Sequence, residues 1–145
     1  MWQARFYQAL PKIVANYPSS RWLFLTLTVR NCEIGDLGET LTVMNAAFKR
    51  MEKRKELSPL QGWIRATEVT RGKDGSAHPH FHCLLMVPSS WFSGVAYVKQ
   101  SRWVELWRDC LRVNYEPNVD IRTVKKKTGE VVANEASKLQ SAVAA

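Results

Sequence analysis

All three histidines of the chain fall within five residues, as His78, His80 and His82. In an extended strand, side chains two positions apart project from the same face, so His80 and His82 point together while Phe81 turns to the opposite, core-facing side. Two imidazoles at that spacing can chelate one cation. Pro79 interrupts the strand ahead of them, so we expect His78 in a loop or at the rim, and its role as a ligand stays open.

Glu68 is the natural third ligand for such a cation. The segment around Glu68 and the segment around the histidines can pair as an antiparallel hairpin. If the numbers of two paired residues add up to about 148 to 150, Glu68 lies across from His80 or His82. The resulting set of two nitrogens and one oxygen leaves positions open for water or a phosphate oxygen. A histidine pair can also be a polar patch or a buried hydrogen-bonded pair. The flanking Leu84 and Met86, however, make two unpartnered imidazoles costly.

Alternating side chains predict the strands that must position these groups, over residues 22–30, 63–70, 81–87 and 119–124. Helical spacing predicts a helix over residues 37–57, opened by a capping box from Asp36 to Glu39 and ended by Ser58-Pro59. A second helix begins at Ser101 as its cap, and a last one carries apolar residues from Val132 to Val143. We therefore expect a single α+β domain over residues 1–145, with a central, mostly antiparallel sheet flanked by helices.

Composition and charge narrow the class of protein. The 145 residues suffice for one hydrophobic core, and no uncharged apolar run is long enough to span a membrane. Cys32, Cys83 and Cys110 form no C-x-x-C pair, so we expect reduced thiols in a cytoplasm. The formal net charge of +8 favours a polyanionic partner such as nucleic acid, although charge alone leaves a membrane surface or an acidic protein open.

Basic residues flank the predicted site on two segments. Arg71 and Lys73 stand in the hairpin loop, and Lys125 and Lys126 follow the last predicted strand. These side chains are candidates for binding DNA phosphates, while a lysine run is also typical of a solvated face. The six tryptophans could stack on unpaired bases, but Trp103 and Trp107, four residues apart, are more typical of a helix face in the core.

Four segments in order resemble the HUH endonuclease superfamily, specifically the plasmid rolling-circle replication initiators. They are FLTLTVRNC (24–32), GWIRATEVTRG (62–72), HPHFHCLLMV (78–87) and YVKQSRWVELW (97–107). The resemblance implies that Mg²⁺ or Mn²⁺ polarises the scissile phosphate of single-stranded DNA at a hairpin origin. A tyrosine hydroxyl then attacks and leaves a 5′-phosphotyrosine and a free 3′-hydroxyl. His80 and His82 match the family's metal ligands, and Glu68 occupies the place of the upstream polar ligand. Host replication proteins are further candidate partners, and a membrane is not.

The sequence departs from the family where the nucleophile is expected. The family carries its tyrosine in a Glu-x-x-Lys-Tyr motif on a helix after the last strand, and that helix here ends ANEASKLQSAVAA. One alignment places Leu139 at the tyrosine position, with Glu135 on the glutamate. The alternative, which we favour, places the motif beyond Ala145, because the helical pattern continues to the last residue. Tyr7, Tyr17, Tyr97 and Tyr115 are interpreted as packing residues rather than nucleophiles.

Three other functions remain open. The first is a metal-supported module that recognises origin DNA without cutting it. The second is a transposase or conjugative relaxase of the same superfamily, although the segments around Phe24 and Trp103 are closer to the replication initiators. The third is a structural zinc or metallohydrolase domain with no role in nucleic acids.

Overall fold

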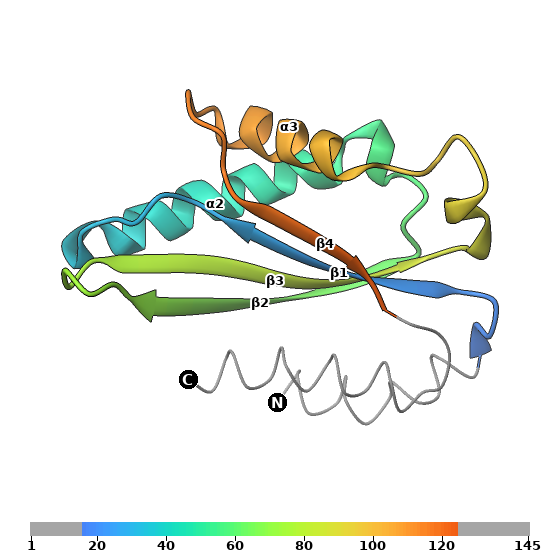
Figure 1. The fold of residues 1–145 in the computed structure, drawn as a ribbon, viewed down its shortest axis with the longest axis horizontal. Coiled ribbons are helices and arrows are strands. Elements are labelled where there is room, and N and C mark those ends of the chain that lie inside the picture. Colours follow the sequence, from blue (N-terminus) through green and yellow to red (C-terminus); the bar gives the residue numbers. More distant parts are fainter. Residues whose placement is uncertain (1–15, 125–145) are drawn as a thin grey trace.

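A computed structural model describes residues 16–124, which form a four-stranded sheet with two α-helices on one face (Figure 1). The strands are β1 (Arg21–Thr28), β2 (Gly62–Arg71), β3 (Ala77–Val87) and β4 (Val119–Thr123). The helices are α2 (Leu37–Glu52) and α3 (Gln100–Leu111), with short 3-10 turns at Ile34–Asp36, Lys55–Leu57 and Ser89–Phe92. The sheet order is β2-β3-β1-β4 and every pairing is antiparallel. The α+β prediction is confirmed.

The main core lies between the sheet and the two helices. Odd-numbered residues of β1 and β3, among them Leu25, Leu27 and Phe81, point towards the helices and are fully buried. Trp103 and Trp107 meet them from α3, and their indole N–H groups donate to the carbonyls of Val98 at 3.1 Å and Thr28 at 2.8 Å. Both tryptophans are therefore core residues, as predicted, and are not available to stack on bases.

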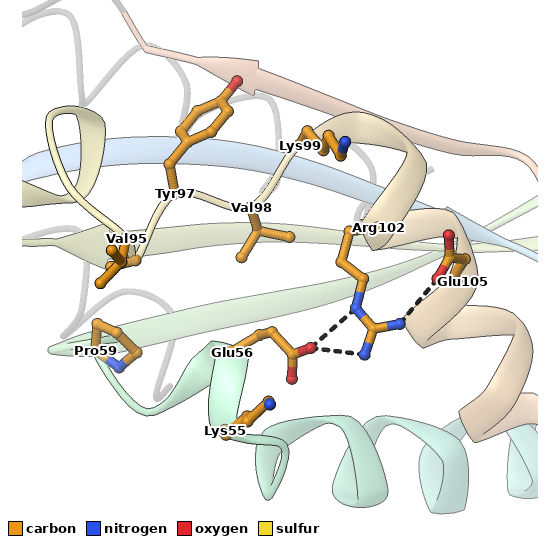
Figure 2. Close-up of a pocket in the computed structure, with 10 residues that line it drawn as sticks. Lys55, Glu56, Pro59, Val95, Tyr97, Val98, Lys99, Arg102 and Glu105 are labelled. Atoms are coloured by element: carbon orange, nitrogen blue, oxygen red, sulfur yellow. Dashed lines mark hydrogen bonds and ion pairs between the residues drawn. The ribbon is translucent and has the colours of Figure 1, made fainter.

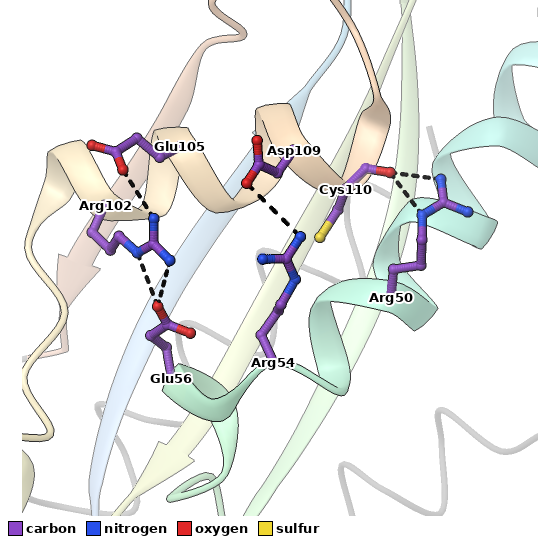
Figure 3. Close-up of polar contacts among 7 residues, drawn as sticks. All are labelled: Arg50, Arg54, Glu56, Arg102, Glu105, Asp109 and Cys110. Atoms are coloured by element: carbon purple, nitrogen blue, oxygen red, sulfur yellow. Dashed lines mark hydrogen bonds and ion pairs between the residues drawn. The ribbon is translucent and has the colours of Figure 1, made fainter.

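Arginines fasten the two helices to each other (Figure 3). The Arg50 guanidinium donates from Nε and Nη2 to the carbonyl oxygen of Cys110, at 2.9 and 2.6 Å, and so satisfies a carbonyl at the end of α3. Arg102 donates to Glu56 at 2.7 and 2.9 Å and to Glu105 at 2.9 Å. These contacts join α3 to α2 and to the Lys55–Leu57 turn.

The helix ends differ from the predictions. α2 stops at Glu52 instead of continuing to Leu57, because Arg54 adopts an extended backbone and a separate 3-10 turn follows. Asp36 is the N-cap residue of α2, but its side chain makes no capping hydrogen bond, so the capping box is wrong. Lys99, rather than Ser101, is the N-cap residue of α3, and Ser101 lies inside the first turn.

The strand ends also differ from the predictions. β1 covers residues 21–28 rather than 22–30, and β2 extends one residue beyond the prediction at each end. β3 begins at Ala77, so Pro79 does not interrupt it. The pairing with β1 ends at His80, so only β2 runs alongside at Pro79, and the missing backbone N–H is tolerated there. Within residues 16–124 no helix has both the length and the apolar character needed to cross a membrane.

Candidate metal centre

The hairpin formed by β2 and β3 places Glu68 and the three histidines on one face of the sheet. The residue numbers of each pair sum to 148, and Glu68 lies directly across from His80, as predicted. The odd-numbered neighbours of the histidines, such as Phe81 and Cys83, are fully buried against the helices, so the histidine side chains project from the opposite face. His78 is part of this row, because Pro79 does not end the strand.

The Glu68 carboxylate contacts His82 rather than its direct partner. Glu68 Oε1 lies 3.0 Å from His82 Nε2, a diagonal contact between neighbouring strands. Both side chains are largely buried, with exposed fractions of 28% and 18%. The predicted oxygen and one predicted nitrogen ligand are thus in direct contact.

His80 is the member of the row whose hydrogen bonding is incomplete. Its Nδ1 is buried and has no hydrogen-bond partner among the described residues. Burial, and then the neighbouring His78, lower the pKa of His80 below its ordinary value. The ring is therefore neutral at physiological pH, which is the form that binds metals. The His80 and His82 rings are nearly parallel, at 7°, with centroids 6.0 Å apart, and His78 lies 4.4 Å from His80.

Thr26 is a site residue that the sequence analysis missed. It pairs with His82 across β1 and β3, and its Oγ1 lies 3.3 Å from His82 Nδ1. Its neighbour Thr28 pairs with His80, but the Thr28 hydroxyl donates to the carbonyl of Asn118 at 2.8 Å. The sequence contained a signal, because Thr26 and Thr28 alternate with the core leucines. The register that brings them opposite the histidines comes only from the fold.

The donor set fits a cation, although the described residues do not hold one in a preformed cage. In residues 16–124 no three His, Cys, Asp or Glu side chains converge on a single point. Glu68 and His82 use their donor atoms on each other. A cation would replace that hydrogen bond and also engage His80, whose Nδ1 is buried without a partner among residues 16–124.

The predicted phosphate contacts lie on different parts of the chain. Lys73 is exposed in the hairpin turn, where Asp74 Oδ1 accepts from the backbone N–H of Ser76 at 3.0 Å. Arg71 is exposed at the end of β2, but its register partner is the buried Ala77, so it shares the helix side of the sheet rather than the face of Glu68. Lys125 and Lys126 lie outside the described residues.

Arg65 also points away from the histidine row, as the parity of β2 predicts. Its guanidinium lies over the rings of Phe48 at 4.8 Å and Phe81 at 4.2 Å, and it donates to Asn45 Oδ1 at 2.8 Å. Arg65 therefore belongs to the core side of the sheet.

The described tyrosines differ in exposure. Tyr17 and Tyr97 are half exposed, at 50% and 55%. Tyr115 does pack, with the Arg30 guanidinium 4.0 Å above its ring. Tyr7, the predicted last helix, Glu135 and Leu139 lie outside the described residues.

The three cysteines are free thiols. Complete burial raises the pKa of the Cys83 thiol to about 12, and burial also raises the pKa of Cys110. Burial therefore disfavours the thiolate form at both positions, and the free thiols agree with the prediction of reduced cysteines.

A cavity of about 470 Å³ lies apart from the histidines, beside the first turn of α3 (Figure 2). Val95, Tyr97 and Val98 line one side and Lys55, Glu56 and Arg102 the other. In Figure 1 the hairpin tip lies at the left end of the molecule and the segment that precedes α3 at the right end. The Arg102 guanidinium in this cavity already forms ion pairs with Glu56 and Glu105, so its charge is neutralised.

Comparison with known proteins gives the family. Curated relatives include a "Protein rep" of Streptococcus pneumoniae, 40% identical over 82% of this chain and 38% of its own length. A "Replication protein" of Staphylococcus aureus is 36% identical over 83% of this chain and 53% of its own length, and a "Protein rep" of Lactiplantibacillus plantarum is 39% identical over 81% and 38%. The chain thus spans about two fifths to one half of these relatives. No solved structure matches it.

The family model described as "Replication protein" (Rep_1) matches residues 1–144, nearly the whole chain. The match confirms the resemblance to plasmid replication initiators that the ordered motifs indicated. The chain belongs to the Rep_1 family of replication proteins.

Proposed function

We propose that this chain is the part of a rolling-circle replication initiator that binds a divalent cation and single-stranded origin DNA for nicking. The observation that carries the proposal is the Glu68–His82 contact beside His80, whose Nδ1 is buried without a partner among residues 16–124, in a chain of the replication protein family. An oxygen and two neutral imidazoles are the donors that suit Mn²⁺, and Mg²⁺ would fill more of its positions with water.

Each of the three side chains has a distinct part in holding the cation. Glu68 supplies the negative charge. It lies on β2 and the histidines lie on β3, so the ligands come from two paired strands of one hairpin. His80 and His82 supply nitrogens from one strand, and the buried Phe81 between them fixes the direction of both. When bound, the cation polarises a phosphate oxygen of the DNA.

The nucleophile is proposed to be a tyrosine of the complete protein, beyond Ala145. Attack by its hydroxyl breaks the bond between phosphorus and the 3′ oxygen, forms the 5′-phosphotyrosine and releases the 3′-hydroxyl. Among residues 16–124 the structure offers no tyrosine in contact with the histidine row. Lys73, Lys125 and Lys126 are proposed phosphate contacts, and Arg71 supports binding from the opposite face of the hairpin.

The test uses the complete protein and single-stranded oligonucleotides tiled across the replicon that encodes it. With Mn²⁺ present we expect a covalent protein–DNA adduct on one hairpin-forming oligonucleotide. The adduct should be lost with His80→Ala or His82→Ala, and the effect of His78→Ala then tells whether His78 is a further ligand. A complete protein that binds the oligonucleotide with Mn²⁺ yet forms no adduct would contradict nicking.

A metal-supported module that recognises the origin without cutting is the second candidate. Leu139, at the position that one alignment gives to the tyrosine, favours it. Metal-dependent DNA binding without an adduct, in the complete protein, is the result that would support this function over nicking.

A further inference from the structure

The ring of His82 is contacted at both nitrogens. Glu68 Oε1 lies 3.0 Å from Nε2 on one side, and Thr26 Oγ1 lies 3.3 Å from Nδ1 on the other. Glu68 belongs to β2 and Thr26 to β1, so the two contacts come from the strands on either side of β3. The ring is therefore oriented by three adjacent strands.

We propose that Thr26 is a positioning residue for His82, and that its hydroxyl holds Nδ1 in both states of the site, as donor without a cation and as acceptor with one. The proposal rests on the cation site of the proposed function. It assigns no catalytic role to Thr26, which acts through His82.

The hydrogens of the imidazole explain why a hydroxyl is needed. An ionised carboxylate only accepts, so in the contact with Glu68 the hydrogen stands on His82 Nε2. In the neutral ring Nδ1 then carries a lone pair and accepts from the Thr26 O–H. For Nε2 to hold a cation, its hydrogen must leave, and the neutral ring carries the hydrogen on Nδ1 instead. That N–H then donates to Thr26 Oγ1, because a hydroxyl serves as donor or acceptor by rotation.

The second nitrogen of a metal-bound histidine usually donates to an oxygen, which fixes the tautomer and the direction of the ring. In this site Thr26 supplies that oxygen, and the Phe24 ring, with its centroid 5.9 Å from that of His82, packs beside the imidazole. Thr26 lies in a central strand and is partly buried, which limits the access of competing water to this contact.

Thr28 shows that a threonine opposite a histidine in the sheet does not always contact the imidazole. It faces the same side two residues along and pairs with His80, as Thr26 pairs with His82. Its hydroxyl, however, donates to the carbonyl of Asn118, and His80 Nδ1 has no partner among the described residues. Thr28→Val is therefore a matched control that removes the same group from the same face without touching an imidazole.

The experiment compares full-chain Thr26→Val, Thr26→Ser and Thr28→Val by calorimetric titration with Mn²⁺. We expect Thr26→Val to weaken Mn²⁺ binding by about tenfold or more, the range typical of lost outer partners of metal-bound histidines. Thr26→Ser should restore most of the affinity, since it keeps the hydroxyl. Thr28→Val should bind as the unaltered chain does.

A second readout follows the ring itself by nitrogen-15 NMR of His82, without metal and with Zn²⁺. We expect the hydrogen on Nε2 in the metal-free protein and on Nδ1 with Zn²⁺. With Thr26→Val the Nδ1–H should exchange rapidly with water. Circular dichroism of the same sample must show that Thr26→Val is folded, because unfolding would also expose the Nδ1–H to exchange with water.

The outcomes separate the two proposals. If Thr26→Val binds Mn²⁺ as tightly as the unaltered chain while His82→Ala does not, the role of Thr26 is wrong and the cation site stands. If the unaltered chain binds neither Mn²⁺ nor Zn²⁺, both proposals fail. If Thr26→Val does not fold, the nitrogen-15 NMR of the unaltered chain tests the proposal alone. A hydrogen on Nδ1 of His82 in the metal-free state would overturn it.

Discussion

The two faces of β3 differ in chemistry although their residues alternate along one strand. Towards the helices lie Phe81 and Cys83, both fully buried in the main core. Towards the other face lie His80 and His82, with hydrogen-bonding groups on both neighbouring strands. The core face fixes the register, because a slip by one residue would bury the imidazoles under the helices. Tight packing on one side thus positions polar groups on the other.

The sharpest way to break this comparison is to remove the core residue between the two histidines. Phe81→Ala should lower the free energy of unfolding by about 3–5 kcal/mol, because it leaves a cavity beneath the strand. Urea denaturation measures the change. His82→Ala, on the opposite face, is the control and should change metal-free stability far less. Equal losses for the two variants would contradict the division between the faces.

A smaller change tests the histidine face alone. Glu68→Gln keeps the shape of the side chain and removes its charge, so Mn²⁺ affinity should fall by more than about tenfold. Unfolding should be nearly unaffected. Calorimetry gives the affinity, and Glu116→Gln, which alters an exposed carboxylate, is the matched control. If Glu68→Gln binds Mn²⁺ normally, the third ligand is a different residue, and His78 becomes the next candidate.

Thiol labelling sharpens the core side of the comparison. Burial raises the pKa of Cys83 to about 12, so at mildly alkaline pH it stays a protonated, inaccessible thiol. Cys32 is only half buried. Iodoacetamide should modify Cys32 in the native protein, and Cys83 only after unfolding, as followed by mass spectrometry. Labelling of Cys83 at the rate of Cys32 would show that the helix face is open.

The smallest effect concerns the helices rather than the strands. The hydrogen bond from Arg102 lowers the pKa of the Glu56 carboxyl below its ordinary value. A carboxyl group with a lowered folded pKa stabilises the protein above its unfolded value and loses that contribution as the pH falls through the folded one. Glu56→Gln should therefore lower stability by up to about 1 kcal/mol at neutral pH, and the difference should vanish in acid.

Thermal unfolding across that pH range measures the Glu56 effect. Glu105→Gln, at a side chain that is 64% exposed, is the control and should cost less. A Glu56→Gln effect that does not change with pH would contradict an electrostatic origin.

Local patterns predicted part of the site well. Alternation in β2 and β3 predicted the hairpin, and its register brought Glu68 across from His80. The β1–β3 register joins residues more than fifty positions apart, and no local pattern specifies it, so Thr26 was missed. The expectation for His78 was wrong because Pro79 lies where β3 has only one neighbouring strand.

The helices were also predicted only in part from local patterns. The apolar spacing predicted both helices and the burial of Trp103 and Trp107. Their ends depended on the backbone of single residues, Arg54 after α2 and Lys99 before α3, which residue type does not determine. The resemblance, confirmed at the level of the family, supplied what no pattern of spacing could, namely the family itself.

The most direct test of the account is a Mn²⁺ titration of the unaltered chain and of the double variant His80→Ala/His82→Ala. The unaltered chain should bind one Mn²⁺ ion, and the double variant should bind none in the same concentration range while remaining folded by circular dichroism. A folded double variant that binds Mn²⁺ as tightly as the unaltered chain would contradict the assignment of the cation to this face of the sheet.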